Sequence, residues 1–308
     1  MKTILVIGAS GFVGGHLAKA LLAEGHAVRC LARDPARVGA LAAAGCAVVR
    51  GDIADLAAVE RAVDGVEAVY ISIHTLSPQP AGGAGPRFMD VEKNGLQNVI
   101  AACRSHAVKR VVYVTSLGIA PDERSEWLRE RWHAEQMLLN SGLDATVIRP
   151  GYIIGVGGRG FDTVVGNAKR RIAVSMGGDR PRMRTIALDD LIYYLVGVLD
   201  DPRAYGRCYD VGNDDVPSIN QLIDGTADVL GRRPPVKLQI PLRLLGALAP
   251  LIERMAKLPA GAIKGFTQGM KVDAVGDPLP IRAVLHRPLL SFRQAVERAL
   301  MIEIEPQR

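Results

Sequence analysis

The sequence predicts an α/β fold in which a doubly wound parallel sheet is followed by a smaller C-terminal α/β lobe. Short runs rich in valine and isoleucine recur without polar alternation, which is typical of parallel strands that are buried on both faces. Segments in which apolar residues have helical spacing separate these runs. Repetition of strand, helix and strand favours one sheet with helices packed on both of its faces.

The first half of the chain carries this alternation throughout. Strands are predicted at residues 3–7, 27–32, 47–50, 68–73, 110–115 and 145–148. The helices between them are predicted at residues 14–24, 37–44, 56–63, 91–105 and 125–141. We assign residues 1–155 to one domain that is built on this sheet.

The second half of the chain lacks the regular alternation and is assigned, as residues 156–308, to a smaller lobe. Helices are expected at 161–171, 189–199, 218–230, 242–255 and 291–300, and strands at 206–211 and 236–240. We expect this lobe to cover the carboxyl edge of the sheet, with some segments returning to the sheet itself. The apolar segment 241–256 contains Pro250 and is predicted to be a kinked helix. The alternative is an amphipathic patch that touches a membrane surface or a protein complex.

Composition and charge exclude several classes of protein. The chain has 308 residues, is 48% hydrophobic and carries a formal net charge of +6, which suits anionic ligands. Its densest basic runs, 169–171 and 180–184, are short and contain no aromatic residue, so nucleic-acid binding is not expected. The cysteines have neither metal-ligand nor disulfide-framework spacing; they are Cys30, Cys46, Cys103 and Cys208. We therefore expect no metal, and we expect a cytoplasmic protein because neither a signal peptide nor a membrane-spanning run is visible.

The first predicted strand runs directly into a glycine-rich loop and then into a helix. Gly8 permits a tight turn, Gly11 permits the backbone to approach a pyrophosphate, and Gly14 permits the helix to pack closely on the strand. The helix N-terminus adds free N–H groups and a positive dipole end. The spacing is GxxGxxG and not GxGxxG, but the flanking strand and helix supply the context of a Rossmann dinucleotide site. Other candidate cofactor contacts in this loop are Ser10, Phe12 and Val13.

The end of the second strand indicates which dinucleotide is bound. A fold that selects NAD places an acidic residue there to hold the ribose hydroxyls. This chain has Arg33, whose guanidinium can fork onto the 2′-phosphate of NADP(H). We predict NADP(H), the alternative being NAD(H) with Arg33 as a solvated loop residue. Asp34 precedes a proline and is predicted to cap the following helix.

Four motifs together resemble the extended and atypical short-chain dehydrogenase/reductase superfamily, especially its NmrA-like and nucleoside-diphosphate-sugar-epimerase-like branches. The motifs occupy residues 8–14, 49–53, 109–116 and 141–151. The resemblance implies that Asp52 and Ile53 contact adenine and that Ser116 is the active-site serine. It also implies that Pro150 and Gly151 form a turn near the nicotinamide. The remaining candidate cofactor contacts are Ser72, Ile73, Thr115 and Ile153.

The sequence departs from that superfamily at its acid–base pair. The family's tyrosine, and the lysine four residues later, correspond here to Trp127 and Arg131. An indole does not ionise and an arginine stays charged, so neither residue can move a proton. Arg131 remains a candidate for holding ribose hydroxyls or phosphate. The candidate catalytic residues are Ser116, Tyr152 and His74, each with a packing or loop role as its alternative.

Two functions therefore stay open on the sequence. The first is an NADP(H)-dependent oxidoreductase that acts on a small carbonyl, enone or quinone-like substrate. The second is a non-catalytic NAD(P)H-binding sensor, assembly factor or accessory subunit, which Trp127 and Arg131 favour. The sequence decides neither the substrate nor the oligomeric state, which is a monomer or a homodimer.

Overall fold

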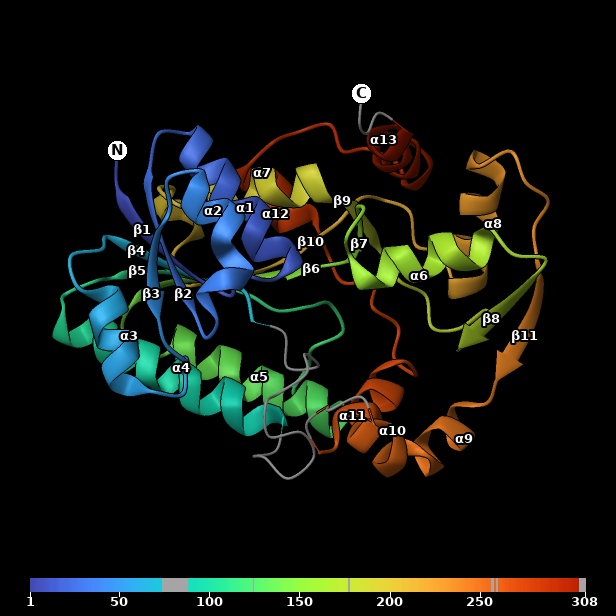
Figure 1. Cartoon of the computed structure of the whole chain (residues 1–308), viewed down its shortest axis with the longest axis horizontal. Coiled ribbons are helices and arrows are strands. Elements are labelled where there is room, and N and C mark those ends of the chain that lie inside the picture. The colour runs from blue at the N-terminus through green and yellow to red at the C-terminus, as the bar shows by residue number, and fades with distance from the viewer. Residues whose placement is uncertain (74–87, 124, 177, 256–257, 259, 305–308) are drawn as a thin grey trace.

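The computed structural model contains a seven-stranded sheet with helices on both faces (Figure 1). It describes residues 1–73, 88–123, 125–176, 178–255, 258 and 260–304. The strand order is β10-β6-β5-β4-β1-β2-β3, and each neighbouring pair is parallel. This is the doubly wound Rossmann-type fold that the sequence predicts.

The six predicted strands are all present, with ends that shift by at most two residues. They are β1 Thr3–Ile7, β2 Ala27–Ala32, β3 Ala47–Arg50, β4 Ala68–Ile71, β5 Arg110–Val114 and β6 Asp144–Pro150. The seventh strand, β10 Arg207–Val211, comes from the second half of the chain and pairs with β6. That half therefore returns a segment to the sheet.

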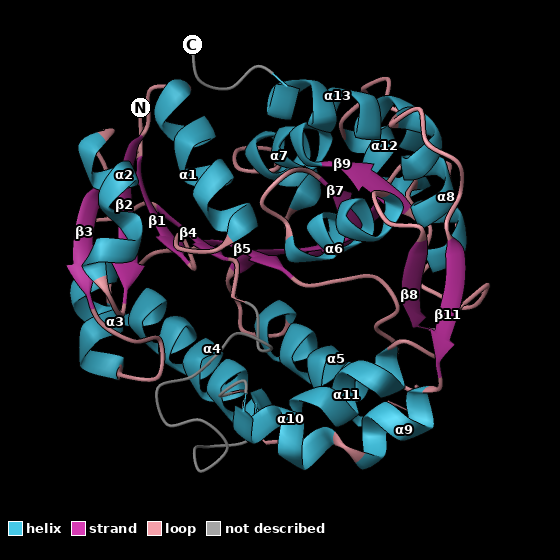
Figure 2. Ribbon diagram, turned by 45° about the vertical axis from the view of Figure 1, so that its right-hand side comes forward, coloured by secondary structure: helices cyan, strands magenta, loops and turns pink. Residues whose placement is uncertain are grey.

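The two faces of the sheet are covered by different sets of helices (Figure 2). One set is α1 Phe12–Ala23 and α7 Leu188–Gly197; the other is α3 Leu56–Val63, α4 Phe88–Ser105 and α5 Glu126–Leu139. Ile4 and Val6 of β1 join the core with α1 and α7, whereas Leu5 and Ile7 join the core with the other set. Alternate side chains point to opposite faces of a strand, so β1 is buried on both sides.

The predicted helix at 37–44 is shorter than expected. A 3₁₀ turn, Pro35–Val38, precedes the short helix α2 Gly39–Ala43. The Asp34 carboxylate accepts a hydrogen bond from the backbone N–H of Ala36 at 3.1 Å. Asp34 therefore caps this turn, as the sequence predicts.

From β7 onward, the chain builds two small parallel sheets and further helices beside the main sheet. One sheet pairs β7 Tyr152–Ile154 with β9 Thr185–Ala187, and the other pairs β8 Ile172–Met176 with β11 Val236–Ile240. The remaining helices are α6 Arg159–Ala168, α8 Ile219–Val229, α9 Leu242–Ala247, α10 Ala249–Met255, α11 Ala262–Gly269, α12 Leu279–Val284 and α13 Phe292–Ile304. A second 3₁₀ turn, Pro202–Ala204, precedes β10.

The helix predicted at 242–255 is divided into α9 and α10 between Ala247 and Ala249. Pro250 is the second residue of α10. A proline has no N–H and its ring collides with the carbonyl four residues earlier, so it fits the first turn of a helix and not the interior. The predicted kink at Pro250 is thus a break between two helices.

Within the part of the chain that the structure describes, no helix combines the length and apolar character needed to cross a bilayer.

The buried hydroxyl of Tyr70 gives a test of the packing between β4 and α7. It donates a 2.7 Å hydrogen bond to the Leu195 carbonyl in a fully buried setting. Tyr70→Phe removes this bond and leaves the carbonyl unsatisfied, so we expect the free energy of unfolding to fall by about 1 kcal/mol. Urea denaturation measures this. Tyr193→Phe is the matched control, because its bond to His286 is exposed and 3.2 Å long. Equal losses in both variants would contradict the assignment.

Candidate functional site

The glycine loop between β1 and α1 leaves no room for side chains at two of its positions. Gly8 has φ +93°, and a Cβ built on it would lie 2.1 Å from the Ser72 carbonyl oxygen. A Cβ on Gly14 would lie 2.4 Å from the Gly8 carbonyl oxygen. The loop is closed by a 2.9 Å hydrogen bond from the Gly11 N–H to that same oxygen. The predicted tight turn and close packing of helix on strand are both present.

The N-terminus of α1 presents unsatisfied backbone donors at this loop. The helix begins at Phe12, and its N-cap, Gly11, provides no side-chain cap. The first N–H groups of any helix have no intrahelical acceptor, so those of Phe12, Val13 and Gly14 are available to an anion. Ser10 is exposed beside them, and Val13 packs partly into the core.

This loop lies at the point where the sheet reverses its winding. β1 pairs with β2 on one side and with β4 on the other. Ser72 and Ile73 follow β4 directly, and the Ser72 N–H donates to the Ile7 carbonyl at 2.8 Å. In open parallel sheets the ligand lies outside the carboxyl ends of the strands at such a reversal. The predicted contacts from β1 and β4 therefore meet at the expected place.

Arg33 and Asp52 lie together beyond the ends of β2 and β3. The Arg33 Nε is 3.9 Å from an Asp52 carboxylate oxygen, and both side chains are more than one third exposed. Asp52 also accepts from the Ala54 N–H at 3.0 Å. Ile53 is buried, and its methyl groups leave no space for a Cβ on Gly95 of α4. Arg33 is therefore a charged, accessible side chain at the position that is predicted to select between NADP(H) and NAD(H).

The aromatic ring of Phe12 is held by a glycine cluster that the sequence reasoning missed. Cβ atoms on Gly155 and Gly158 would each lie 2.9 Å from this ring, and Gly157 has φ +87° beside it. These glycines connect β7 to α6, so this connection packs against the first turn of α1. The run Gly155-Val-Gly-Gly158 was the available signal, but spacing alone does not reveal a partner 140 residues away.

Ser116 follows β5 and accepts a hydrogen bond from Arg131. The Arg131 Nη1 donates to the Ser116 Oγ at 3.3 Å. Arg131 is 2% exposed on α5, and its Nε lies 3.2 Å from a carboxylate oxygen of the fully buried Glu92 on α4. Burial opposes the positive charge of Arg131, but the nearby Glu92, Tyr113 and Glu135 together outweigh burial and raise the pKa of Arg131 above its usual value. The guanidinium is therefore a fixed cation beside Ser116.

Glu92 also binds Tyr113, which extends this buried network under the sheet. The Tyr113 hydroxyl donates a hydrogen bond to the Glu92 carboxylate. Burial raises the pKa of Tyr113 well above its ordinary value, and the negative charge of Glu92 adds to the effect. Tyr113 thus stays protonated and donates its hydrogen bond to Glu92. Glu92 is in turn the buried counter-ion of Arg131, which stands at the position of the family's lysine.

Trp127 lies one helical turn before Arg131 and covers it. The Arg131 guanidinium is 5.3 Å from the centre of the indole ring, a cation–π distance. A Cβ on Gly269 of α11 would lie 2.8 Å from that ring, so α11 packs directly on it. The buried indole N–H finds no hydrogen-bond partner in the described ranges. Trp127 acts here as a hydrophobic cover over a charge.

A second buried ion pair fixes the ends of β5 and β6. The Thr115 hydroxyl donates to Glu135 at 2.6 Å, and Glu135 is paired with Arg149. Arg149 also approaches Asp210 of β10 at 3.8 Å. The hydroxyl of Thr115, a predicted cofactor contact, is therefore directed toward α5.

The turn after β6 places the remaining predicted residues. Pro150 is buried, and a Cβ on Gly151 would lie 2.3 Å from the Arg184 carbonyl oxygen. Ile153 packs against the core formed with α1 and α7. The Tyr152 ring packs instead into the lobe. A Cβ built on Gly160 would lie 3.1 Å from the Tyr152 hydroxyl oxygen. Burial raises the pKa of Tyr152, so the phenol stays protonated.

The last of the predicted catalytic residues is His74, and it lies outside the described residues. Among the described residues, no group of three or more histidine, cysteine, aspartate or glutamate side chains has the arrangement of a metal site.

The chain is similar in sequence to proteins of known families. A family model described as NAD(P)H-binding matches residues 8–202. The 2-alkyl-3-oxoalkanoate reductase of Stenotrophomonas maltophilia is 27% identical over 278 residues, which cover 82% of each chain. The (4-alkanoyl-5-oxo-2,5-dihydrofuran-3-yl)methyl phosphate reductase of Streptomyces griseus is 28% identical over 297 residues, covering 94% of this chain and 95% of its own.

The fold is also shared with solved structures. An NADPH-dependent quinone oxidoreductase of Escherichia coli, complexed with NADPH, aligns with a TM-score of 0.71. The alignment covers 96% of this chain and 99% of that one at 20% sequence identity, so the likeness is one of fold.

Gly14→Ala tests the contact between α1 and β1. The new methyl group would lie 2.4 Å from the Gly8 carbonyl oxygen, so α1 must move away from the loop. We expect the Kd for NADPH, measured by fluorescence titration, to rise at least about tenfold, and stability to fall by about 1–3 kcal/mol. Gly39→Ala is the control, because no atom lies within 4 Å of its Cβ position. Unchanged NADPH affinity in Gly14→Ala would show that the loop does not hold the dinucleotide.

Proposed function

Because the chain belongs to the NAD(P)H-binding family of the atypical short-chain dehydrogenase/reductase superfamily, we propose that it is an NADP(H)-dependent oxidoreductase. The proposed substrate is a small carbonyl, enone or quinone-like molecule. One observation carries the proposal: the glycine loop and Ser116 follow strands of the same parallel sheet, at its carboxyl edge. The glycine loop has no room for a Cβ at Gly8 or Gly14. Such a loop suits a pyrophosphate that is bound by backbone N–H groups.

The binding roles follow from the positions of the side chains. The donors of Phe12, Val13 and Gly14 would hold the pyrophosphate, and Arg33 would pair with the 2′-phosphate. Asp52 and Ile53 would border the adenine. Bound NADPH supplies a hydride to the acceptor.

Ser116 is the group that we assign to the substrate. Arg131 donates to the Ser116 Oγ, so the hydroxyl proton of Ser116 is left to donate to a substrate oxygen. The buried positive charge of Arg131 stabilises negative charge that develops on that oxygen during hydride transfer. Quinone and enone acceptors suit such a site, because the proton that completes the reaction can come from water. The names of the two relatives, both reductases of oxo compounds, support this class of reaction.

A second candidate function is a non-catalytic NAD(P)H-binding protein. One observation favours it: Trp127 and Arg131 stand at the positions of the family's acid–base pair. Trp127 packs against the Arg131 guanidinium, and Arg131 forms an ion pair with Glu92. In that case Arg131 and Trp127 stabilise the fold, and Ser116 has no substrate.

Arg33→Ala tests the proposed preference for NADP(H). Loss of a charge-assisted pair with the 2′-phosphate should raise the Kd for NADPH about 10- to 100-fold while the Kd for NADH changes little. Calorimetric titrations of both nucleotides measure this. Arg37→Ala, which removes a nearby exposed arginine in the 3₁₀ turn, is the matched control. If the wild-type protein binds NADH more tightly than NADPH, Arg33 does not select the cofactor.

Ser116→Ala tests the catalytic proposal against the second candidate. Purified protein with NADPH is assayed against a panel of quinones, enones and aldehydes. We expect turnover by the wild-type protein and a fall in kcat of about 100-fold in Ser116→Ala, with the Kd for NADPH unchanged. Ser105→Ala, at the exposed end of α4, is the control. Absence of turnover across the panel, despite tight NADPH binding, would favour the non-catalytic function.

A further inference from the structure

The two-stranded sheet of β8 and β11 exposes an apolar face. Ile172 and Val174 of β8 are 61% and 36% exposed, and Val236 and Leu238 of β11 are 71% and 59% exposed. Ile172 pairs with Val236, and Val174 with Leu238, so the four side chains form a compact group on one face. We call these four residues the apolar strand face. It lies far along the molecule from β1–β3 (Figure 1).

The opposite face of this sheet is the one that packs on the protein. Ala173 and Ser175 are fully buried, and Ala173 belongs to the core formed with α6 and α8. Lys237 forms an ion pair with Asp224 of α8. Ala173, Ser175 and Lys237 therefore turn toward the protein, whereas the apolar strand face is left exposed within the described part of the chain.

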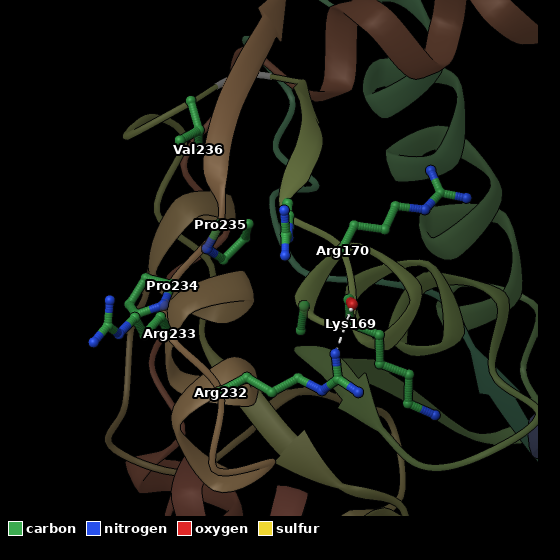
Figure 3. Close-up of a pocket in the computed structure, with 9 residues that line it drawn as sticks. Lys169, Arg170, Arg232, Arg233, Pro234, Pro235 and Val236 are labelled. Carbon is green, nitrogen blue, oxygen red and sulfur yellow. Dashed lines mark hydrogen bonds between the residues drawn. The ribbon is translucent and has the colours of Figure 1, made fainter.

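Five cations gather at the beginning of these two strands. A pocket there is lined by residues 168–171 and 232–236 and includes Lys169, Arg170, Arg171, Arg232 and Arg233 (Figure 3). Arg232 reaches across it and donates a 2.9 Å hydrogen bond to the Lys169 carbonyl, which ties the two segments together. None of these lining residues is acidic.

The acidic groups of the neighbouring helix do not neutralise this cluster. Asp224 is paired with Lys237, and Asp228 is paired with Arg293 of α13. Neither Arg170 nor Arg171 forms an ion pair within the described part of the chain. The cluster therefore keeps a net positive charge directly beside the apolar strand face.

We propose that the apolar strand face and the adjoining cation cluster dock this protein onto an anionic phospholipid bilayer. Exposed aliphatic side chains can enter the boundary between headgroups and acyl chains, while Lys and Arg side chains bind the phosphate layer. The two groups of residues adjoin each other, because Val236 lines the pocket and Arg171 directly precedes Ile172. A second copy of this chain is a poorer occupant, because the copies carry the same net charge of +6 and repel one another.

The segment 241–256 follows β11 directly; the sequence predicts a kinked helix there, with contact to a membrane surface or a protein complex as the alternative. Leu248, Leu251 and Met255 are 45%, 58% and 77% exposed and have the spacing of one helical face. Figure 2 places α9 directly beneath β11. This segment therefore adds further exposed apolar side chains shortly after β11.

Vesicle co-sedimentation of the full chain tests the proposal. We expect binding to vesicles of phosphatidylcholine that contain phosphatidylglycerol, and at least about tenfold weaker binding to phosphatidylcholine alone. High salt should weaken the binding, because it screens the charges. Absence of binding, or equal binding to both kinds of vesicle, would overturn the proposal.

Two double variants locate the surface. Arg170→Glu/Arg171→Glu should weaken binding to anionic vesicles at least about 25-fold, since each cation near such a surface contributes about fivefold. Ile172→Ser/Leu238→Ser should weaken it comparably. Matched controls are Arg61→Glu/Lys109→Glu and Leu56→Ser, which change exposed residues on α3 and before β5. All variants should keep the wild-type Kd for NADPH, which shows that they fold.

The outcome for the variants decides between occupants. Wild-type binding by both double variants would overturn the proposal. So would a dimer, seen by sedimentation velocity, that dissociates in Ile172→Ser/Leu238→Ser while vesicle binding is unaffected. That result would assign the apolar strand face to a second copy of the chain.

Discussion

The close approach of α1 to β1 is the constraint on which the rest of this structure depends. The Gly8 carbonyl oxygen receives the Gly11 N–H and stands where a Cβ on Gly14 would be, so helix and strand meet without side chains between them. This contact aims the free N–H groups of α1 along the carboxyl edge of the sheet. It also brings Phe12 against the Gly155–Gly158 turn, which ties the two halves of the chain together at the site. Cofactor binding and the placement of the second half therefore share one packing requirement.

A buried ion pair replaces the acid–base pair that the superfamily resemblance implies. Arg131 and Glu92 are almost completely removed from water, which is unfavourable for each charge unless its partner is present. Tyr113 and Ser116 satisfy further donors and acceptors of this pair, and Trp127 excludes water from it. The arrangement fixes the guanidinium rigidly behind Ser116. Where the resemblance implies an ionisable tyrosine and a lysine, this chain therefore has an indole and a guanidinium that keeps its proton.

The sequence was sufficient for the sheet because its strands are buried on both faces and carry an unmistakable Val/Ile pattern. It also located the glycine loop and the Asp34 cap, whose signals are local. It did not reveal Glu92 as the partner of Arg131, because the two lie on different helices that only the fold brings together. The same holds for the glycines around Phe12. A strand at 206–211 and a return of segments to the sheet were expected, but the sequence did not show that β10 pairs with β6. Pro250 was read as a kink, but its position in the first turn of a helix depends on where α9 ends.

The chemistry open to this site follows from what Arg131 can and cannot do. A guanidinium keeps its proton under all ordinary conditions, and here Glu92 strengthens that hold. Ser116 can donate a hydrogen bond to a substrate oxygen, but transferring its proton would leave an alkoxide, and the neighbouring Arg131 does not give up a proton to restore the hydroxyl. Under the proposed function, the site therefore suits acceptors whose reduced form is stabilised as an anion until water protonates it. A quinone or enone meets this condition better than a simple ketone, because its charge is delocalised over a conjugated system.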